Sequence, residues 1–267
     1  MLFRSRAETV PIELGRHGGT ISPAVVAVLP DGRVATAGED GRVRIWDPDH
    51  AGTVSLILGH EEDWVRSVLV VMAALRDGRV ATGDVYGRIR IWDPQAVGSA
   101  PFELGHHDGR ALAVTALPGG DVATAGKDGR VVVWADSPSG RVARELKHHD
   151  GEVRAMTALP DGRLATGEAN GRIRVWPRGP ADGDPVDLGR HDGAVHAMTA
   201  LPGDRLVTSG DDRQVRIWAI SRRIELTRIA CSGPVIAASF TSTSSNARLI
   251  VAHEGGGMSG WSIDVAS

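Results

Sequence analysis

Residues 28–46 read VLPDGRVATAGEDGRVRIW, and residues 158–176 read ALPDGRLATGEANGRIRVW. The two stretches are nearly the same, although more than a hundred residues separate their starts. Related copies stand at two further places, ALPGGDVATAGKDGRVVVW at 116–134 and ALPGDRLVTSGDDRQVRIW at 200–218. Self-similarity at a fixed period is the signature of repeat architectures, so this repeat decides the fold.

Tryptophan marks the period of the repeat. Six of the seven tryptophans end their copies at intervals of 42 to 46 residues, namely Trp46, Trp92, Trp134, Trp176, Trp218 and Trp261. Within a copy, apolar and polar residues alternate with a step of two, which is typical of β-strands. In the fifth copy this pattern predicts strands at 194–201, 205–209, 214–218 and 223–229. In the turn Leu-Pro-Asp-Gly, proline suits a fixed φ and glycine a positive one.

Four short strands in each copy predict one twisted antiparallel sheet, or blade. A single blade cannot bury both of its faces, so the copies must stack around an axis. We therefore predict an all-β fold, a six-bladed β-propeller that forms a single domain over residues 1–267. The third strands of its blades end at the six tryptophans, and residues 1–8 form a short tail.

Proline identifies the outermost strand of a blade. The segments TVPIELGRH (9–17), SAPFELGHH (99–107) and GDPVDLGRH (183–191) each carry a proline six residues before a histidine. Proline has no amide hydrogen to donate, so it belongs at the edge of a sheet. The last copy, from 235 to about 263, supplies only three strands. We therefore expect the N-terminal strand, residues 9–14, to complete the last blade and close the ring.

The composition suits a cytoplasmic protein. Hydrophobic residues make up 42% of the chain, but only three are Phe and one is Tyr, so aliphatic side chains and tryptophan must fill the core. The net charge of −3 gives no basic body for nucleic acid. The single cysteine, Cys231, excludes a disulfide framework. The first residues lack an apolar run long enough for a signal peptide or a membrane span, so we expect no membrane partner.

Over residues 9–263 the copies resemble WD repeats, five times clearly and once weakly. Each clear copy has a histidine before the first strand, a threonine in the second, and a tryptophan ending the third. The scarcity of lysine, two of the thirty basic residues, favours a bacterial member of that family. The resemblance implies a buried hydrogen-bond chain from Trp through Thr and His to Asp. Complete sets are His17, Thr36, Asp40 and Trp46; His107, Thr124, Asp128 and Trp134; and His191, Thr208, Asp212 and Trp218.

The other three copies depart from this pattern. The fourth has His149, Thr166, Asn170 and Trp176; the second has His60, Thr82, Tyr86 and Trp92; and the sixth has Val251, Gly255 and Trp261. A closed chain of this kind satisfies a buried imidazole, hydroxyl and indole N–H together. We therefore interpret the His–Asp pairs as parts of the fold, not as catalytic dyads.

No pattern in the sequence predicts a catalytic residue, a cofactor or a metal ion. The His-His-Asp runs at 106–108 and 148–150 lie on different blades, and each lends one histidine to the buried chain. A Gly-x-Gly-x-x-Gly spacing at 255–260 precedes a strand, whereas a phosphate-binding loop must open a helix. The paired arginines of the third strands, such as Arg172 and Arg174, alternate with Val and Ile. Their stems should pack between blades and their charged heads should reach acidic neighbours or water.

The resemblance also implies a binding surface, the wide face formed by the loops entering the first strands and the turns between second and third strands. The positions that point there differ from copy to copy on a constant frame, as a binding face on a repeated scaffold requires. Trp and Arg are enriched at interface hot spots. We predict a monomeric, non-catalytic scaffold that binds a protein partner with an acidic surface through Trp64, Arg66, Arg110, Leu112, Lys127, Arg154 and His196.

Three alternatives stay open from the sequence. The residues named for the wide face can be ordinary solvated loop residues, with Trp64 packed under the longer second copy. The chain can be the recognition module of a larger bacterial signalling or defence ATPase or kinase. It can also be an enzyme or a sugar-binding propeller with its chemistry in the central channel.

Overall fold

The structure is a computed structural model, and regular structure in it consists almost wholly of strands. One short 3₁₀ helix, η1 (Pro48–His50), is found in the described part of the chain. The described residues are 14, 17, 26–38, 42–50, 54–58, 69–96, 98–137, 140–146, 149–179, 183–231, 233, 235–242, 247–253 and 258–263. Within them the chain is all-β, as predicted.

The strands form five four-stranded antiparallel sheets and one three-stranded sheet, numbered 1 to 6 in chain order. Sheet 1 contains β1 (Val26–Val28), β2 (Val34–Ala37), β3 (Val43–Trp46) and β4 (Val54–Leu58). Sheet 2 contains β5 (Leu69–Ala74), β6 (Val80–Asp84), β7 (Arg88–Trp92) and β8 (Phe102–His106). Sheet 3 contains β9 (Ala111–Ala116), β10 (Val122–Gly126), β11 (Val131–Ser137) and β12 (Gly140–Leu146). Sheet 4 contains β13 (Val153–Ala158), β14 (Leu164–Glu168), β15 (Arg172–Trp176) and β16 (Val186–Arg190). Sheet 5 contains β17 (Val195–Leu201), β18 (Arg205–Gly210), β19 (Gln214–Ala219) and β20 (Ile224–Ala230). Sheet 6 contains β21 (Val235–Ser242), β22 (Ala247–His253) and β23 (Met258–Ile263).

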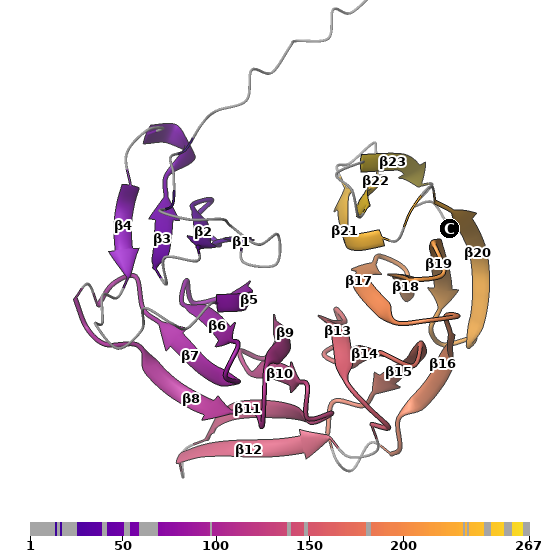
Figure 1. Cartoon of the computed structure of the whole chain (residues 1–267), viewed down its shortest axis with the longest axis horizontal. Helices are drawn as coiled ribbons and strands as arrows, with labels where there is room; N and C mark the ends of the chain where they lie inside the picture. Colours follow the sequence, from indigo (N-terminus) through magenta and orange to yellow (C-terminus); the bar gives the residue numbers. More distant parts are fainter. Residues whose placement is uncertain are drawn as a thin grey trace, which may run out of the picture.

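The six sheets follow one another around an arc (Figure 1). The first strands lie innermost, and each contacts the first strand of the next sheet, from β1 and β5 through to β17 and β21. The fourth strands lie outermost, and sheets 1 and 6 stand apart at the two ends of the arc (Figure 1). This arrangement is consistent with a propeller. Ring closure by residues 9–14 concerns residues that, except for Leu14, lie outside the described part, so it stays a prediction.

The strand boundaries agree closely with the pattern read from the repeat. In the fifth copy, all four strands begin and end within one residue of the predicted ranges. The glycines of the Leu-Pro-Asp-Gly turns have the positive φ that the turn requires, 87° at both Gly32 and Gly162. In the fifth copy the order of these residues changes to Gly203-Asp204, and Asp204 also has a positive φ of 58°.

The hydrophobic core lies between neighbouring sheets. Ile173 and Val175 of sheet 4 pack in one cluster with Leu206 and Trp218 of sheet 5. Sheets 4 and 5 therefore bury their facing sides against each other, as the stacking argument requires.

A glycine in the outermost strand of one sheet makes room for the tryptophan of the next. At Gly189 in β16, an added Cβ would lie 2.4 Å from the six-membered ring of Trp218. At Gly105 in β8, it would lie 2.2 Å from the ring of Trp134. These distances are far below a normal van der Waals contact, so only glycine fits at these two positions without displacing the indole.

Candidate partner-binding face

A tryptophan and a threonine are joined in each of the first five sheets. The indole Nε1–H of the tryptophan that ends the third strand donates to Oγ1 of a threonine in the second strand over 2.6 to 2.9 Å. The pairs are Trp46–Thr36, Trp92–Thr82, Trp134–Thr124, Trp176–Thr166 and Trp218–Thr208. These are the five pairs that the family resemblance implies.

In sheets 3 and 5 the hydrogen-bond chain continues through histidine to aspartate. Thr124 Oγ1 lies 2.9 Å from His107 Nε2, and His107 Nδ1 lies 3.1 Å from Asp128 Oδ1. The distances in sheet 5 are 2.8 Å for His191–Thr208 and 2.9 Å for His191–Asp212. The indole donates to the hydroxyl, the hydroxyl donates to Nε2, and the Nδ1–H donates to the carboxylate. With a neutral imidazole, every polar group in this hydrogen-bond chain has a partner.

These histidines are shut off from solvent. The side chains of His107 and His191 are both 0% exposed. Burial lowers the pKa of both histidines below their ordinary value of 6.5, although Asp128 and Asp212 oppose this effect. A neutral and inaccessible imidazole cannot reach a substrate, so the His–Asp pairs hold the fold together.

Sheets 1 and 4 carry the chain as far as the histidine. His17 Nε2 lies 2.7 Å from Thr36 Oγ1, and His149 Nε2 lies 3.3 Å from Thr166 Oγ1. The predicted sixth-copy residues Val251 and Trp261 lie in β22 and β23. The residues that lie outside the described part, and whose places in the chain stay predictions, are Asp40, His60 and Gly255.

In sheet 2, Asp84 supplies the carboxylate that the sequence pattern lacks. It lies at the end of β6, two residues before Tyr86, the residue at the aspartate position. Its Oδ1 accepts the backbone N–H groups of Tyr86 and Arg88, both at 2.9 Å, and its Oδ2 accepts from Arg90 at 3.2 Å. Asp212 makes the same kinds of contact in sheet 5, to a turn N–H and to an arginine.

Glu168 has the equivalent place in sheet 4. It ends β14 and is fully buried, and its Oε1 lies 2.9 Å from Nη1 of Arg174. Burial raises its pKa, and the positive charge of Arg174 opposes this rise. The side-chain amide of Asn170 donates to Glu168 Oε2 at 3.0 Å. Asn170, at the aspartate position, thus works together with a carboxylate two residues before it.

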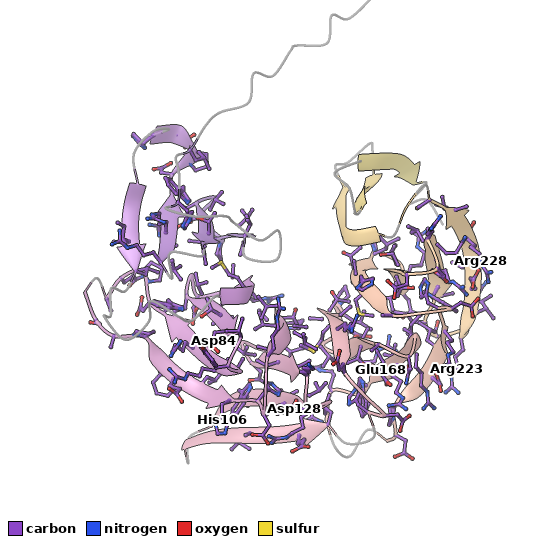
Figure 2. The ribbon with its side chains drawn as sticks, in the orientation of Figure 1. Asp84, His106, Asp128, Glu168, Arg223 and Arg228 are labelled. Carbon is purple, nitrogen blue, oxygen red and sulfur yellow. The ribbon has the colours of Figure 1, made fainter. Side chains whose placement is uncertain are left out.

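Figure 2 shows Asp84, Asp128 and Glu168 in three successive sheets. The arginines Arg90 and Arg174 face two of these carboxylates, and both arginines are buried. The prediction that the charged heads of third-strand arginines reach acidic neighbours is confirmed for these two residues, and each acid belongs to the same sheet as its arginine.

The sequence contains a signal for Asp84 and Glu168, the acids that stand two residues before the expected aspartate position. The tryptophan pattern alone misses this signal. After the threonine, sheets 1 and 3 have Ala-Gly, whereas sheets 2 and 4 have Gly followed by Asp or Glu. At Gly126 an added Cβ would lie 2.6 Å from the ring of His107, and at Gly167 it would lie 2.5 Å from Val195. In each of the two types of turn, glycine therefore stands at the position where a side chain would clash. Comparing the copies at these two positions finds Asp84 and Glu168.

The first strands of sheets 2 to 6 share a β-bulge at the same place, close to where each strand begins. The extra residues at these register shifts are Val70, Leu112, Arg154, His196 and Ile236. A bulge bends its strand and redirects the side chain of the extra residue. Three of the residues predicted for the wide face, Leu112, Arg154 and His196, therefore occupy one equivalent position.

The turn between second and third strands meets the entry to the first strand in the same sheet. The N–H of Lys127 donates to the carbonyl of Arg110 at 2.9 Å, and the equivalent bonds in sheets 4 and 5 measure 2.8 and 3.0 Å. Each sheet thus brings together the residue before the first strand, the bulge residue and the turn residue. These are Arg110, Leu112 and Lys127 in sheet 3; Glu152, Arg154 and Ala169 in sheet 4; and Ala194, His196 and Asp211 in sheet 5.

Sheets 4 and 5 pair their own basic side chains with acids at this face. Nη2 of Arg154 lies 3.0 Å from Oε2 of Glu152, and Nε2 of His196 lies 2.5 Å from Oδ1 of Asp211. Burial alone would raise the pKa of Asp211, but the hydrogen bonds from His196 and from the N–H of Ala194 hold it below its ordinary value. Arg154 and His196 are thus each already paired with an acid of their own sheet.

Sheet 3 differs from its neighbours in this respect. Arg110 and Lys127 are both exposed, and Leu112 is half-buried. Among the described residues, no acidic side chain forms an ion pair with Arg110 or Lys127. The structure thus brings three predicted residues together and leaves their two charges open to solvent.

Two predicted residues of this face, Trp64 and Arg66, lie outside the described part and stay predictions. In the portion of the chain that the structure describes, no group of three or more His, Cys, Asp and Glu side chains is placed to hold a metal ion. The same portion contains no helix of sufficient length and apolar character to cross a membrane.

Comparison with known proteins identifies the repeat. The family model described as WD domain, G-beta repeat matches residues 14–47, 140–177 and 186–219. Each match runs as far as a tryptophan that donates to a threonine, and each includes the histidine that contacts this threonine. No curated protein matches the chain as a relative. The three family matches coincide with three of the observed hydrogen-bond chains and show WD repeats at these three places in the chain.

Proposed function

We propose that this chain is a non-catalytic scaffold that binds a protein partner on its wide face. WD40 repeats generally mediate protein–protein interaction. The observation that carries the proposal is the bulge position, where one backbone geometry presents Leu112, Arg154 and His196 in three successive sheets. A constant frame with a different side chain at each copy is what recognition of a specific partner requires.

The use of polar groups in the frame supports the same function. The Trp, Thr, His and Asp side chains of sheets 3 and 5 satisfy one another inside the fold. The residues left for recognition are those around the bulges. The lone cysteine, Cys231, fits a reducing compartment, and we place the scaffold in the cytoplasm as a monomer.

The experiment is affinity capture of partners from cell extract with two matched variants. The first variant carries Leu112→Ala, Arg154→Ala and His196→Ala, which removes the bulge side chains. The second carries Arg76→Ala, Gln95→Ala and Arg222→Ala, three exposed residues in turns at the opposite ends of the strands. We expect a partner that the wild type and the second variant retain and that the first variant loses.

Both variants must first show the circular dichroism spectrum of the wild type. A partner retained by the bulge variant would contradict the proposal, and so would a partner lost equally from both variants. Loss from the opposite-face variant alone would move the binding surface to the other face.

A further inference from the structure

We propose that sheet 3 is the part of the wide face that binds an acidic peptide segment, with Arg110 and Lys127 pairing with its carboxylates. This inference rests on the proposed scaffold function and names the chemistry of the partner. It is carried by the difference in charge pairing among sheets 3, 4 and 5, which share the same backbone frame.

The two cationic side chains leave the backbone at one place. The N–H of Lys127 donates to the carbonyl of Arg110 at 2.9 Å. A Cβ built on Gly109, the residue before Arg110, would lie 3.7 Å from the Cβ of Lys127. Two flexible cations with neighbouring origins can close on one acidic segment from both sides.

The acids of sheet 3 are directed elsewhere. Glu145 lies 3.0 Å and Asp128 lies 4.0 Å from the guanidinium of Arg130. The hydrogen bond to Glu145 raises the pKa of Arg130, and the charges of Asp128 and Asp108 add to this rise. The negative charge of this sheet is therefore gathered around Arg130, and the positive charge of Arg110 and Lys127 is left for a partner.

An incoming carboxylate meets different conditions on the next two sheets. At sheet 4 it would have to displace Glu152 from Arg154, and at sheet 5 it would have to displace Asp211 from His196. At sheet 3 no acidic side chain in the described part of the chain is ion-paired with Arg110 or Lys127. Complementary charge at an interface favours encounter and selects among partners, so sheet 3 is the favoured position for an acidic group.

An apolar surface adjoins the two cations. Leu112 is half-buried at the bulge of sheet 3, and Val85 is half-buried at the equivalent turn position of sheet 2. The turn that contains Val85 is held beside the entry to sheet 3, because the N–H of His107 donates to the carbonyl of Gly87 at 2.9 Å. The best ligand thus has an apolar side chain between or beside its carboxylates.

The distribution of charge favours a short acidic peptide over a nucleic acid. The chain has a net charge of −3, and Arg110 and Lys127 supply two cations at this place. Tight nucleic-acid binding needs several phosphate contacts in a row.

The test uses fluorescence anisotropy with labelled decapeptides in a Gly-Ser background. The probes carry a central Glu-Leu-Glu, Gln-Leu-Gln, Lys-Leu-Lys or phosphoserine-Leu-phosphoserine, and a single-stranded oligothymidylate is included. We expect the wild type to bind the Glu probe at least about tenfold more tightly than the Gln probe at low salt. Added salt should reduce this difference, because exposed charges are screened.

The variant Arg110→Glu/Lys127→Glu should lose the preference for the Glu probe and gain one for the Lys probe. Arg76→Glu/Arg222→Glu makes the same change of net charge on the opposite face and should behave as the wild type. If the reversed variant fails to fold, Arg110→Gln/Lys127→Gln replaces it and should bind the Glu and Gln probes equally. If only the phosphoserine probe binds, the site recognises phosphate and not carboxylate, and the acidic-peptide assignment is wrong.

Failure to distinguish the Glu probe from the Gln probe, or tighter binding of the oligothymidylate, would overturn the inference. Retention of the Glu preference by the reversed variant would overturn it as well. If the bulge variant still loses its captured partner in such a case, the scaffold function stands and only the acidic assignment fails.

Discussion

A buried neutral histidine makes the stability of a protein depend on pH. The unfolded chain protonates its histidines near pH 6.5, whereas His107 and His191 have lower pKa values in the fold because burial disfavours the imidazolium. Below pH 6.5 the unfolded state therefore binds protons that the folded state does not, and the free energy of unfolding falls. Above pH 6.5 both states are neutral and the full contribution of the two histidines is present.

We predict that the urea midpoint falls between pH 7.5 and pH 5.5, and that His191→Gln makes this fall smaller while lowering stability at pH 7.5. His106→Gln is the comparison variant, since this exposed residue ends the outer strand β8 of sheet 2 (Figure 2). Its variant should change the pH dependence less than His191→Gln does, because His106 makes the smallest of the contributions named for the lowered pKa of His107. The exposed His50 has a pKa raised by its hydrogen bond to Asp47 and acts in the opposite direction in all three proteins. An equal pH dependence in His191→Gln and the wild type would contradict the assignment.

At the scale of the strand, the fit of one outer strand against the next tryptophan limits which residues the repeat tolerates. We predict that Gly189→Ala lowers the free energy of unfolding by about 1–3 kcal/mol, because the new methyl group must displace the ring of Trp218. Gly119→Ala is the matched control, since no atom lies within 4 Å of an added Cβ there. Its effect should stay within about 1 kcal/mol.

Chemical denaturation followed by tryptophan fluorescence measures both effects. A displaced Trp218 should also change the native emission spectrum of Gly189→Ala, while Gly119→Ala should leave it unchanged. Equal stability of the two variants would show that the indole moves aside at no cost.

The junction after sheet 5 departs from this pattern. By strand register Ile229 in β20 lies where Gly189 lies in β16, since Val215 pairs with Ile229 as Ile173 pairs with Gly189. The outer strand of sheet 5 therefore has isoleucine at the position where sheet 4 has glycine.

Most strands could be predicted from the sequence because their signals are local. Alternation, the turn glycines and the tryptophan period lie within one copy and need no knowledge of neighbouring sheets. The roles of Asp84 and Glu168 depend on which side chains a turn has room for. The pairing of Arg154 with Glu152 and of His196 with Asp211 depends on where each bulge directs its side chain. The residues that the single sequence named in sheets 3 to 5 lie around the bulges, and their role in binding stays a prediction. Which of their charges are open could not be predicted from one sequence.

At the scale of the whole molecule, sheet 1 presents an apolar side chain at one end of the arc. Val26 lies opposite Thr36, as Met72 and Met198 lie opposite the threonines of their own sheets. Val26 is 46% exposed, whereas Met72 is 8% and Met198 is 9% exposed. In the described part of the chain, sheet 1 has a neighbouring sheet on one side, whereas sheets 2 and 5 have one on each side.

We predict that residues 9–14 complete sheet 6 and join the two ends. Deletion of residues 1–14 should then lower Tm, by about 2–4 °C for each kcal/mol lost, because it exposes a sheet edge and leaves the ring open. Deletion of residues 1–8 is the control and should leave Tm unchanged. Differential scanning calorimetry of the three proteins decides the matter, and equal Tm values for the two deletions would refute closure by this strand.

The hydrogen-bond chain crosses from one sheet to the next. His107 follows the last strand of sheet 2, yet its partners Thr124 and Asp128 belong to sheet 3. The family matches at 140–177 and 186–219 have the same offset, since each begins in a fourth strand and ends with a third. A gene duplication of one such unit inserts a sheet whose attachments to both neighbours are already encoded. Proteins built this way can evolve by gaining or losing whole units, with no new contact needed at either junction.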